Sequence, residues 1–203
     1  MLVALVGIDG AGKTTQARRL AVALRARGMR ARYAEHGGGR PVIDPLARLL
    51  GRRDGPDLLG PAHIPVEAGL RWLAVARSAA LARVTRGVVV MDRAGVCQLA
   101  TMRARRDGSA DAAVERRVRA AFARLPRPDV VCLLTLPPAV AQERVERRGR
   151  DREELARLEA FDRAYRSLPE ASSFVRVDAS GDEDAVHAAL LRVVLPVVAR
   201  GDR

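Results

Sequence analysis

Lysine is almost absent from this chain of 203 residues, aromatic residues make up 3% of it, and it has only two cysteines. The shortage of aromatics predicts an aliphatic core and argues against the stacking surfaces with which single-strand nucleic-acid binders hold bases. Cys97 and Cys132 have neither metal-ligand nor disulfide-framework spacing, so we expect both to be small buried residues. No apolar run could span a bilayer, and residues 2–6 are too few for a signal peptide, which predicts a cytoplasmic protein that does not enter a membrane.

Positive charge, in contrast, is in excess. The chain has 36 Lys and Arg against 24 Asp and Glu, a net charge of +12 and an isoelectric point near 11.3. This excess fits a nucleic-acid partner or phosphate ligands attracted from a distance, and charge alone does not decide between them. Lys13 is the one lysine, so a compact ammonium was kept at a single position where a planar guanidinium would not fit the same site.

Short apolar runs alternate with longer segments of helical periodicity, which is typical of strand–helix units in α/β proteins. We predict one domain over residues 1–203, a doubly wound five-stranded parallel sheet with helices on both faces. The stretch 51–65, rich in Gly and Pro, is predicted to be a surface connection. The predicted strands are residues 2–6, 32–35, 88–92, 130–135 and 174–178, and the predicted helices are residues 13–27, 41–50, 66–85, 110–125, 138–148, 153–168 and 184–199.

A glycine-rich loop connects the first predicted strand to the first predicted helix. It follows the pattern G-x-x-x-x-G-K-[ST], in which glycines let backbone N–H groups turn toward phosphate oxygens at the positive end of a helix. Lys13 is expected to bridge the β- and γ-phosphates of ATP, and the Thr14 hydroxyl to help hold Mg²⁺. The predicted ATP-binding residues are Gly7, Asp9, Gly10, Ala11, Gly12, Lys13, Thr14 and Thr15.

A second element, Val88-Val-Val-Met-Asp-Arg93, ends in a carboxylate at the sheet edge where ligands bind in such folds. A charged side chain directly after an apolar run is costly to bury unless it pairs with another group or with a ligand. We therefore predict that Asp92 supports Mg²⁺ through water, together with Thr14, and that Arg93 faces phosphate. A hydrolytic ATPase commonly has a glutamate after the acid to activate water, whereas an arginine suits transfer between two phosphates.

Four arginines surround one glycine in the segment Glu146-Arg-Arg-Gly-Arg-Asp-Arg-Glu153, between two predicted helices. Charge runs are usually solvated faces. Beside a phosphate-binding loop, however, this pattern is typical of a lid that neutralises the transferring phosphoryl group and excludes water when it closes. We predict such a lid at about residues 146–155, with Arg150 and Arg152 joining Lys13 and Arg93 as catalytic residues.

Over essentially the whole chain, these motifs resemble the thymidylate kinase family of P-loop nucleoside monophosphate kinases. The glycine-rich loop, the Asp92-Arg93 pair, Pro128-Asp129 before a predicted strand and the arginine-rich segment all match that family's pattern. The resemblance implies ATP with Mg²⁺ as the phosphate donor, a nucleoside monophosphate as the acceptor, with dTMP giving dTDP, and a homodimer. It also implies that Asp9 faces the acceptor's sugar and that Arg77 contacts its base.

The departures from the family's pattern lie mainly on the acceptor side. Ala34 replaces the arginine of an Arg-Glu-Pro-Gly-Gly stretch, Leu73 aligns with an aromatic that stacks on the base, and Ala94 replaces the aromatic after Asp-Arg. Cys97 and Ala100-Thr-Met102 replace residues that help to recognise the deoxyribonucleotide. The donor motifs are therefore intact, whereas the acceptor pocket differs from that of the family.

Other residues of this chain are expected to compensate for these departures. Arg40 or Arg32 would take over the acceptor phosphate, and Trp72 would provide a stacking face. The predicted substrate-binding residues are Asp9, Glu35, Arg40, Trp72, Arg77 and Arg93.

A monophosphate acceptor is already ionised at neutral pH, so positioning and charge neutralisation suffice and no general base is required. This fits the inventory, since His36, His63 and His187 are scattered and are expected at the surface.

Two alternatives stay open. One is a small-molecule kinase acting on a hydroxyl, for which Asp9, Glu35 or Glu67 would serve as the base. The other is a basic, nucleic-acid-associated ATPase, which the shortage of aromatics disfavours, so a nucleic-acid partner is not expected. A GTPase switch is excluded because no Asn-Lys-x-Asp motif exists in a chain with one lysine.

Overall fold

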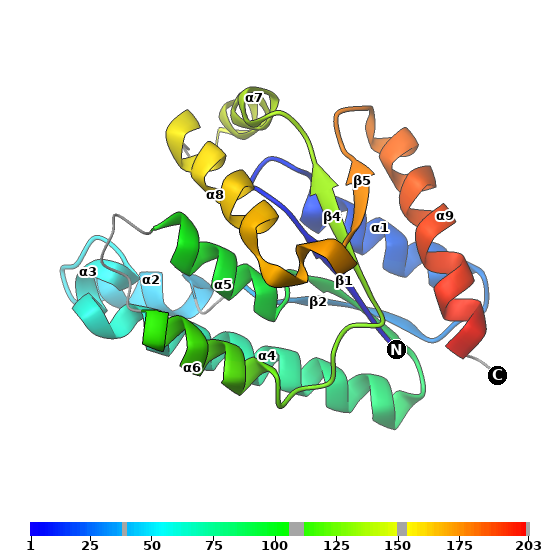
Figure 1. Cartoon of the computed structure of the whole chain (residues 1–203), viewed down its shortest axis with the longest axis horizontal. Coiled ribbons are helices and arrows are strands. Elements are labelled where there is room, and N and C mark those ends of the chain that lie inside the picture. Colours follow the sequence, from blue (N-terminus) through cyan, green and yellow to red (C-terminus); the bar gives the residue numbers. More distant parts are fainter. Residues whose placement is uncertain (38–39, 106–111, 150–153, 202–203) are drawn as a thin grey trace.

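In a computed structural model, which describes residues 1–37, 40–105, 112–149 and 154–201, five parallel strands form one sheet in the order β2-β3-β1-β4-β5 (Figure 1). The predicted doubly wound parallel sheet is thereby confirmed. In register, Val3 of β1 pairs with Val90 of β3 and Val130 of β4. The strands are β1 (Leu2–Val6), β2 (Ala31–Glu35), β3 (Val88–Asp92), β4 (Val130–Thr135) and β5 (Val175–Asp178).

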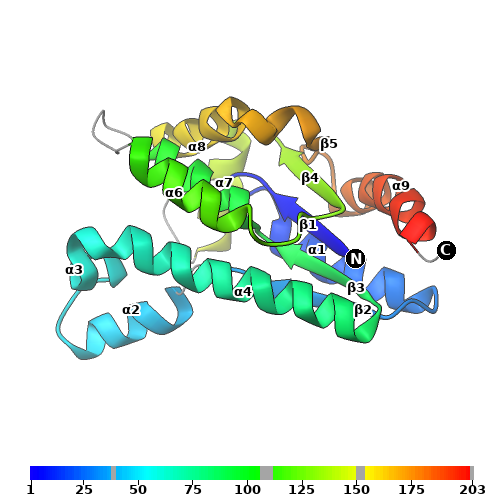
Figure 2. The ribbon, with the colours of Figure 1, turned by 60° about the horizontal axis from the view of Figure 1, so that its bottom comes forward.

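Helices cover both faces of this sheet. α1 and α9 pack together on one face, whereas α4, α5 and α8 cover the other, with α6 packed against α4 and α5 and with α7 beside α8 (Figures 1 and 2). The helices are α1 (Lys13–Ala26), α2 (Arg40–Leu49), α3 (Gly55–Leu59), α4 (His63–Thr85), α5 (Gly95–Ala104), α6 (Ala112–Phe122), α7 (Pro138–Arg148), α8 (Leu155–Ser167) and α9 (Glu183–Gly201), and the 3-10 turns are η1 (Gly60–Ala62) and η2 (Pro169–Ser173).

The core is aliphatic, as predicted from the shortage of aromatics. Every residue of the central strands β1 and β3 is buried, because helices cover both faces of a parallel sheet. Cys97 and Cys132 are buried and free, in agreement with the prediction. Within the described ranges, no helix is both long and apolar enough to cross a membrane.

Two helices were absent from the sequence prediction. α3 lies in the stretch 51–65, for which a surface connection and no helix was predicted; it begins at an N-cap, Asp54, whose side chain accepts a hydrogen bond from the backbone N–H of Asp57 at 2.9 Å. α5 has no amphipathic period because the run Cys97 to Met102 is buried on every side. Its carboxyl-terminal half nevertheless lines the site described next.

Candidate active site

The glycine-rich loop between β1 and α1 is packed tightly against the neighbouring elements. Gly7 and Gly10 have φ angles of +144° and +87°, which favour glycine. A Cβ atom on Gly7 would lie 2.5 Å from the carbonyl oxygen of Leu134 in β4, and one on Gly10 would lie 2.4 Å from that of Ala141 in α7. The loop therefore needs glycine at both positions, and Thr14 and Thr15 at the start of α1 stay exposed to a ligand.

Lys13 lies buried inside this loop. Its Nζ donates hydrogen bonds to the carbonyl oxygen of Ile8 at 2.7 Å and to the carboxylate of Asp9 at 3.2 Å. Burial lowers the pKa of the Lys13 ammonium, although the charge of Asp9 opposes this shift. The single lysine of the chain is thus held at the centre of the phosphate-binding loop.

Asp9 connects the loop to β3. Its Oδ1 accepts hydrogen bonds from Lys13 and, at 2.7 Å, from the guanidinium of Arg93. Burial alone would raise the pKa of Asp9, but the two cations outweigh it and hold the pKa well below its usual range. Arg93 follows β3 with a φ of +78°, a strained conformation of the kind found at functional sites. Two cations therefore converge on one carboxylate between the loop and β3.

Asp92 and Thr14 meet directly beside this trio. The Thr14 hydroxyl donates to Oδ2 of Asp92 at 2.5 Å, and the Tyr33 hydroxyl lies 3.4 Å from the same oxygen. The other oxygen, Oδ1, is buried and has no hydrogen-bond partner among the described residues. Burial, with the charges of Asp92 and Glu35, raises the pKa of Tyr33 to about 12, so its hydroxyl stays a donor. A hydroxyl beside a carboxylate with an unused oxygen is a donor set that suits Mg²⁺.

An open pocket of about 160 Å³ extends from this edge of the sheet. It is formed by the loop after β1, β2, α4, β3, α5 and α8, so it draws on most of the chain. The lining residues are Asp9, Thr14, Glu35, Gly37, Glu67, Arg71, Asp92, Arg93, Thr101, Arg157 and Phe161.

Arg71 is the buried cation of this pocket that the sequence analysis missed. Its side chain is 3% exposed and donates one hydrogen bond, from Nη2 to Glu67 at 2.9 Å. Its Nε and Nη1 have no partner among the described residues. Unpaired donors at such a depth are costly, which points to a ligand that accepts from them.

Several predicted acceptor residues are not brought together here. Arg77 is exposed on α4 and does not line the pocket. The indole N–H of Trp72 donates to the carbonyl oxygen of Ala121 at 2.9 Å, which directs the ring toward α6. Glu35 lines the pocket as predicted, whereas the side chain of Arg40 lies outside the described part, as do Arg150 and Arg152.

A second pocket, of about 290 Å³, lies on the other side of the loop, between α1, α7 and the start of α9. Arg144 of α7 spans it, because its guanidinium donates to the carbonyl oxygens of Ala179, Ser180 and Gly181 at 2.7–3.1 Å. Arg144 was not found from the sequence, since nothing in its neighbourhood along the chain distinguishes it from other surface arginines. The loop thus has one pocket on each side.

His36 is buried with 1% exposure, so its predicted surface position is wrong. It follows β2 and bridges to α4, where Nε2 contacts the carbonyl oxygen of Ala74 at 3.1 Å and the hydroxyl of Ser78 at 3.0 Å. Burial lowers the pKa of His36. The residue fastens β2 to α4 and does not contact the glycine-rich loop through any hydrogen bond of the described residues.

Comparison with known proteins places the chain in a family. A model of the family Thymidylate kinase matches residues 70–190. The thymidylate kinase of Xylella fastidiosa (strain M12) is 33% identical over 204 residues, covering 98% of this chain and 88% of that protein. The thymidylate kinase of Xanthomonas euvesicatoria pv. vesicatoria (strain 85-10) is 34% identical over 196 residues, covering 92% of this chain and 79% of that protein. The chain therefore belongs to the thymidylate kinase family, a family of nucleoside monophosphate kinases that use ATP, as its motifs had predicted.

Proposed function

We propose that the chain transfers the γ-phosphoryl group of ATP to dTMP, giving ADP and dTDP. One observation carries the proposal: the carboxylate of Asp9 holds Lys13 of the donor loop and Arg93 of the acceptor pocket together, at 3.2 and 2.7 Å. Transfer between two phosphates requires positive charge close to both of them, and two cations held by one carboxylate would provide it. The thymidylate kinases to which the chain is similar support dTMP as the acceptor.

The chemistry needs no general base. An oxygen of the acceptor's phosphate, already ionised, forms the bond to the γ-phosphorus while the bond from that phosphorus to the β,γ-bridging oxygen breaks, and ADP leaves. Lys13 would neutralise the donor phosphates and Arg93 the acceptor phosphate as charge redistributes. The pocket lined by Arg144 would take the nucleoside end of ATP, because it adjoins Thr15 and Gly12.

Mg²⁺ belongs to the proposal as well. The Thr14 hydroxyl would hold the ion directly and Asp92 through water, since Oδ1 of Asp92 has no other partner among the described residues. When bound, the ion would neutralise charge on the transferring phosphates. Tyr33 would orient the Asp92 carboxylate through its hydroxyl.

The remaining predictions concern the extent of the unit and its lid. We keep one P-loop kinase domain over residues 1–203, which the single five-stranded sheet of the described residues supports. A lid near residues 146–155 is supported by Gly149, whose φ of +67° ends α7 before the segment that contains Arg150 and Arg152. Arg40 stays a candidate for the acceptor phosphate.

The two rival functions are disfavoured by specific contacts. Asp9 would be a poor base for a hydroxyl acceptor, because Lys13 and Arg93 lower its pKa and occupy its carboxylate. A nucleic-acid-dependent ATPase would need a residue that activates water beside Asp92, and the neighbour there is Arg93. Glu35 and Glu67 keep the hydroxyl-kinase alternative open to test.

The test is an ADP-release assay on the purified full chain with ATP, Mg²⁺ and a panel of acceptors: dTMP, dUMP, UMP, dCMP, dAMP, dGMP and thymidine. We expect the highest kcat/KM with dTMP and no reaction with thymidine. Activity toward thymidine alone would establish the hydroxyl kinase, and no transfer to any monophosphate would overturn the proposal. ADP release that requires a polynucleotide and falls steeply with salt would establish the ATPase.

We also propose a homodimer formed by α4. Along this helix, Val66, Leu70, Leu73 and Val84 are exposed at successive separations of four, three and eleven residues, which place them on one side of the helix, and Leu73 is 60% and Val84 84% exposed. An apolar row of this kind can pack against the same row on a second copy of the chain across a twofold axis. Light scattering should give twice the 21.9 kDa chain mass, and Leu73→Glu should give the monomer. A monomeric parent chain would reject this arrangement.

A further inference from the structure

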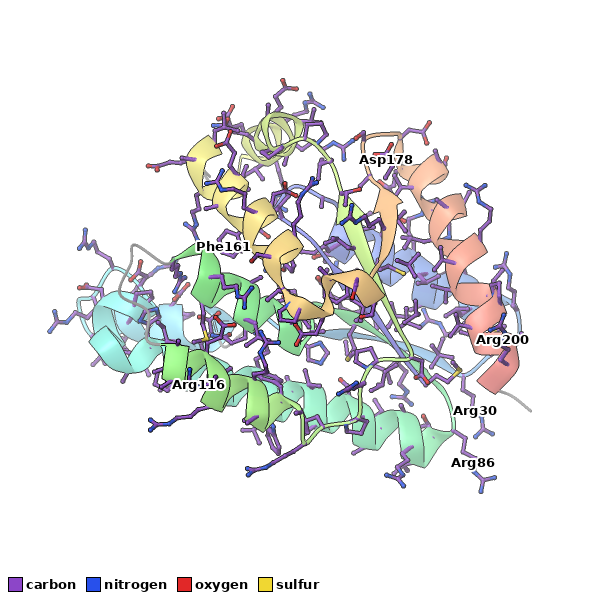
Figure 3. All side chains as sticks on the ribbon, in the orientation of Figure 1. Arg30, Arg86, Arg116, Phe161, Asp178 and Arg200 are labelled. Atoms are coloured by element: carbon purple, nitrogen blue, oxygen red, sulfur yellow. The ribbon has the colours of Figure 1, made fainter. Side chains whose placement is uncertain are left out.

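The acceptor pocket has a single apolar side chain among the described residues that line it. That residue is Phe161 of α8, and every other lining side chain is polar or charged or belongs to glycine. Phe161 projects from α8 on the side of α5 (Figure 3). Trp72, the ring that the sequence analysis had assigned to this purpose, is directed toward α6 by its hydrogen bond to Ala121. The pocket therefore has one aromatic face, and it comes from a different helix than expected.

Phe161 is held in place by its helix and by a neighbouring cation. Leu158 and Tyr165, on the same helix, are buried in the core, so α8 is fixed against the sheet layer beneath it. One turn before Phe161, the guanidinium carbon of Arg157 lies 6.0 Å from the centre of the ring, a cation–π contact at the limit of its usual range. Arg157 also lines the pocket. The ring is thus held by a rigid helix and offers contact area to a ligand at little cost in side-chain entropy.

The hydrogen-bonding groups of the same pocket suit the edge of a base and not its face. Arg71, which lines the pocket, has two buried donor atoms without a partner among the described residues. Hydrogen-bonding groups read base edges, whereas a face is recognised by stacking on an aromatic ring or a guanidinium plane.

We infer that Phe161 is the face on which the base of the acceptor nucleotide stacks, making it a substrate-binding residue of α8. The inference rests on the proposed function, because it takes the acceptor to be a nucleotide. The phosphate of the acceptor is held by Arg93 at the sheet edge, and its base reaches α8, where Phe161 packs against it beside Arg157. Phe161 thereby replaces the ring that the departures on α4 removed.

The experiment compares acceptors with and without a base. Phe161→Ala is expected to raise the KM for dTMP about tenfold, with the KM for ATP unchanged, because stacking is lost only on the acceptor side. Phe161→Tyr should keep the KM for dTMP within about threefold, since it keeps the ring. 2-Deoxyribose 5-phosphate, a competitor without a base, should inhibit the parent enzyme and Phe161→Ala with the same inhibition constant. Trp72→Phe is the matched control and should change neither constant.

The outcomes separate this inference from the proposed function. If the parent enzyme phosphorylates no monophosphate, the proposed function fails and the variants are not needed. If the parent is active but Phe161→Ala leaves the KM for dTMP unchanged, or weakens the base-free competitor equally, the stacking role is rejected. Should Phe161→Ala fail to fold, Phe161→Leu decides, because it keeps apolar volume without a ring and must show the same loss for dTMP alone.

Discussion

The donor and acceptor sides of the site are built in opposite ways. On the donor side, one contiguous stretch, residues 7–15, supplies the loop, the lysine and the threonines. On the acceptor side, the lining residues beyond that stretch come from five separate parts of the chain, at β2, α4, β3, α5 and α8, and most of them are charged. A contiguous loop is fixed by local geometry, whereas a dispersed pocket changes with each substitution. The same kinase framework can therefore keep its donor and alter its acceptor.

The largest effect is expected at Lys13. Lys13→Ala removes the one cation buried inside the loop, so kcat should fall about 10²–10³-fold while the fold is retained. Lys13→Arg should be nearly as inactive, because a planar guanidinium does not replace a compact ammonium in this space. Steady-state kinetics with circular dichroism checks both variants. An active Lys13→Arg enzyme would contradict the argument that the loop accepts only a compact ammonium at this position.

Substitution of a loop glycine whose surroundings leave no room for a Cβ atom should have the next largest effect. Gly10→Ala would press a Cβ against the carbonyl oxygen of Ala141, so we expect kcat/KM for ATP to fall about 100-fold through misplacement of the loop. Gly12 also has a positive φ, +80°, but none of the described atoms lies within 4 Å of its would-be Cβ. Gly12→Ala should therefore cost only about tenfold, from backbone strain. Equal losses in the two variants would contradict the close packing of the loop on α7.

On the acceptor side, two arginines of α4 provide a matched pair. Arg71 is buried in the pocket and Arg77 is exposed, so Arg71→Lys should raise the KM for dTMP about tenfold and Arg77→Lys should leave it within twofold. Lysine is chosen because Arg71→Ala would leave Glu67 without its partner in a largely buried position. Neither variant should change the KM for ATP. The reverse result would restore the assignment of base contact to Arg77 that the sequence resemblance implied.

These contrasts explain which features could be predicted from the sequence. All five strands and the glycine-rich loop were recognised because their signals are local: apolar runs, turn residues and a motif of fixed spacing. Arg71 and Phe161 could not be recognised, because each becomes notable only when α4 and α8 meet at one pocket. On α4, Arg71 and Arg77 look alike in sequence, and burial alone distinguishes them.

The smaller errors have the same origin. α5 was missed because a helix buried on every side lacks the amphipathic period that reveals helices. His36 was expected at the surface because a lone histidine in a loop gives no sign that α4 will cover it. Sequence reasoning thus succeeds where neighbours along the chain determine the outcome and fails where contacts between distant segments do.

The smallest expected effect concerns His36, which fastens β2 to α4. Its Nε2 is occupied by Ala74 and Ser78, and its Nδ1 is buried without a partner among the described residues, so a second proton has no acceptor there. Burial lowers the pKa of His36 in the folded state, so the unfolded chain takes up this proton first as the pH falls through the usual histidine pKa of about 6.5. Stability from this residue is therefore present above that pKa and is lost on acidification.

Acidification from pH 7.5 to pH 5.5 should lower the free energy of unfolding. Each kcal/mol lost in this way should lower the melting temperature of the protein by about 2–4 °C. His36→Gln, which keeps a donor at the Nε2 position, should melt at a lower temperature than the parent protein at pH 7.5. Acidification should lower the melting temperature of this variant less than that of the parent. His187→Gln is the control for the other histidine whose pKa burial lowers, and the parent's pH dependence should largely survive in it. If His36→Gln kept the full pH dependence, another group would be the source of the acid sensitivity, and His36 would fasten β2 to α4 without making that contact sensitive to pH.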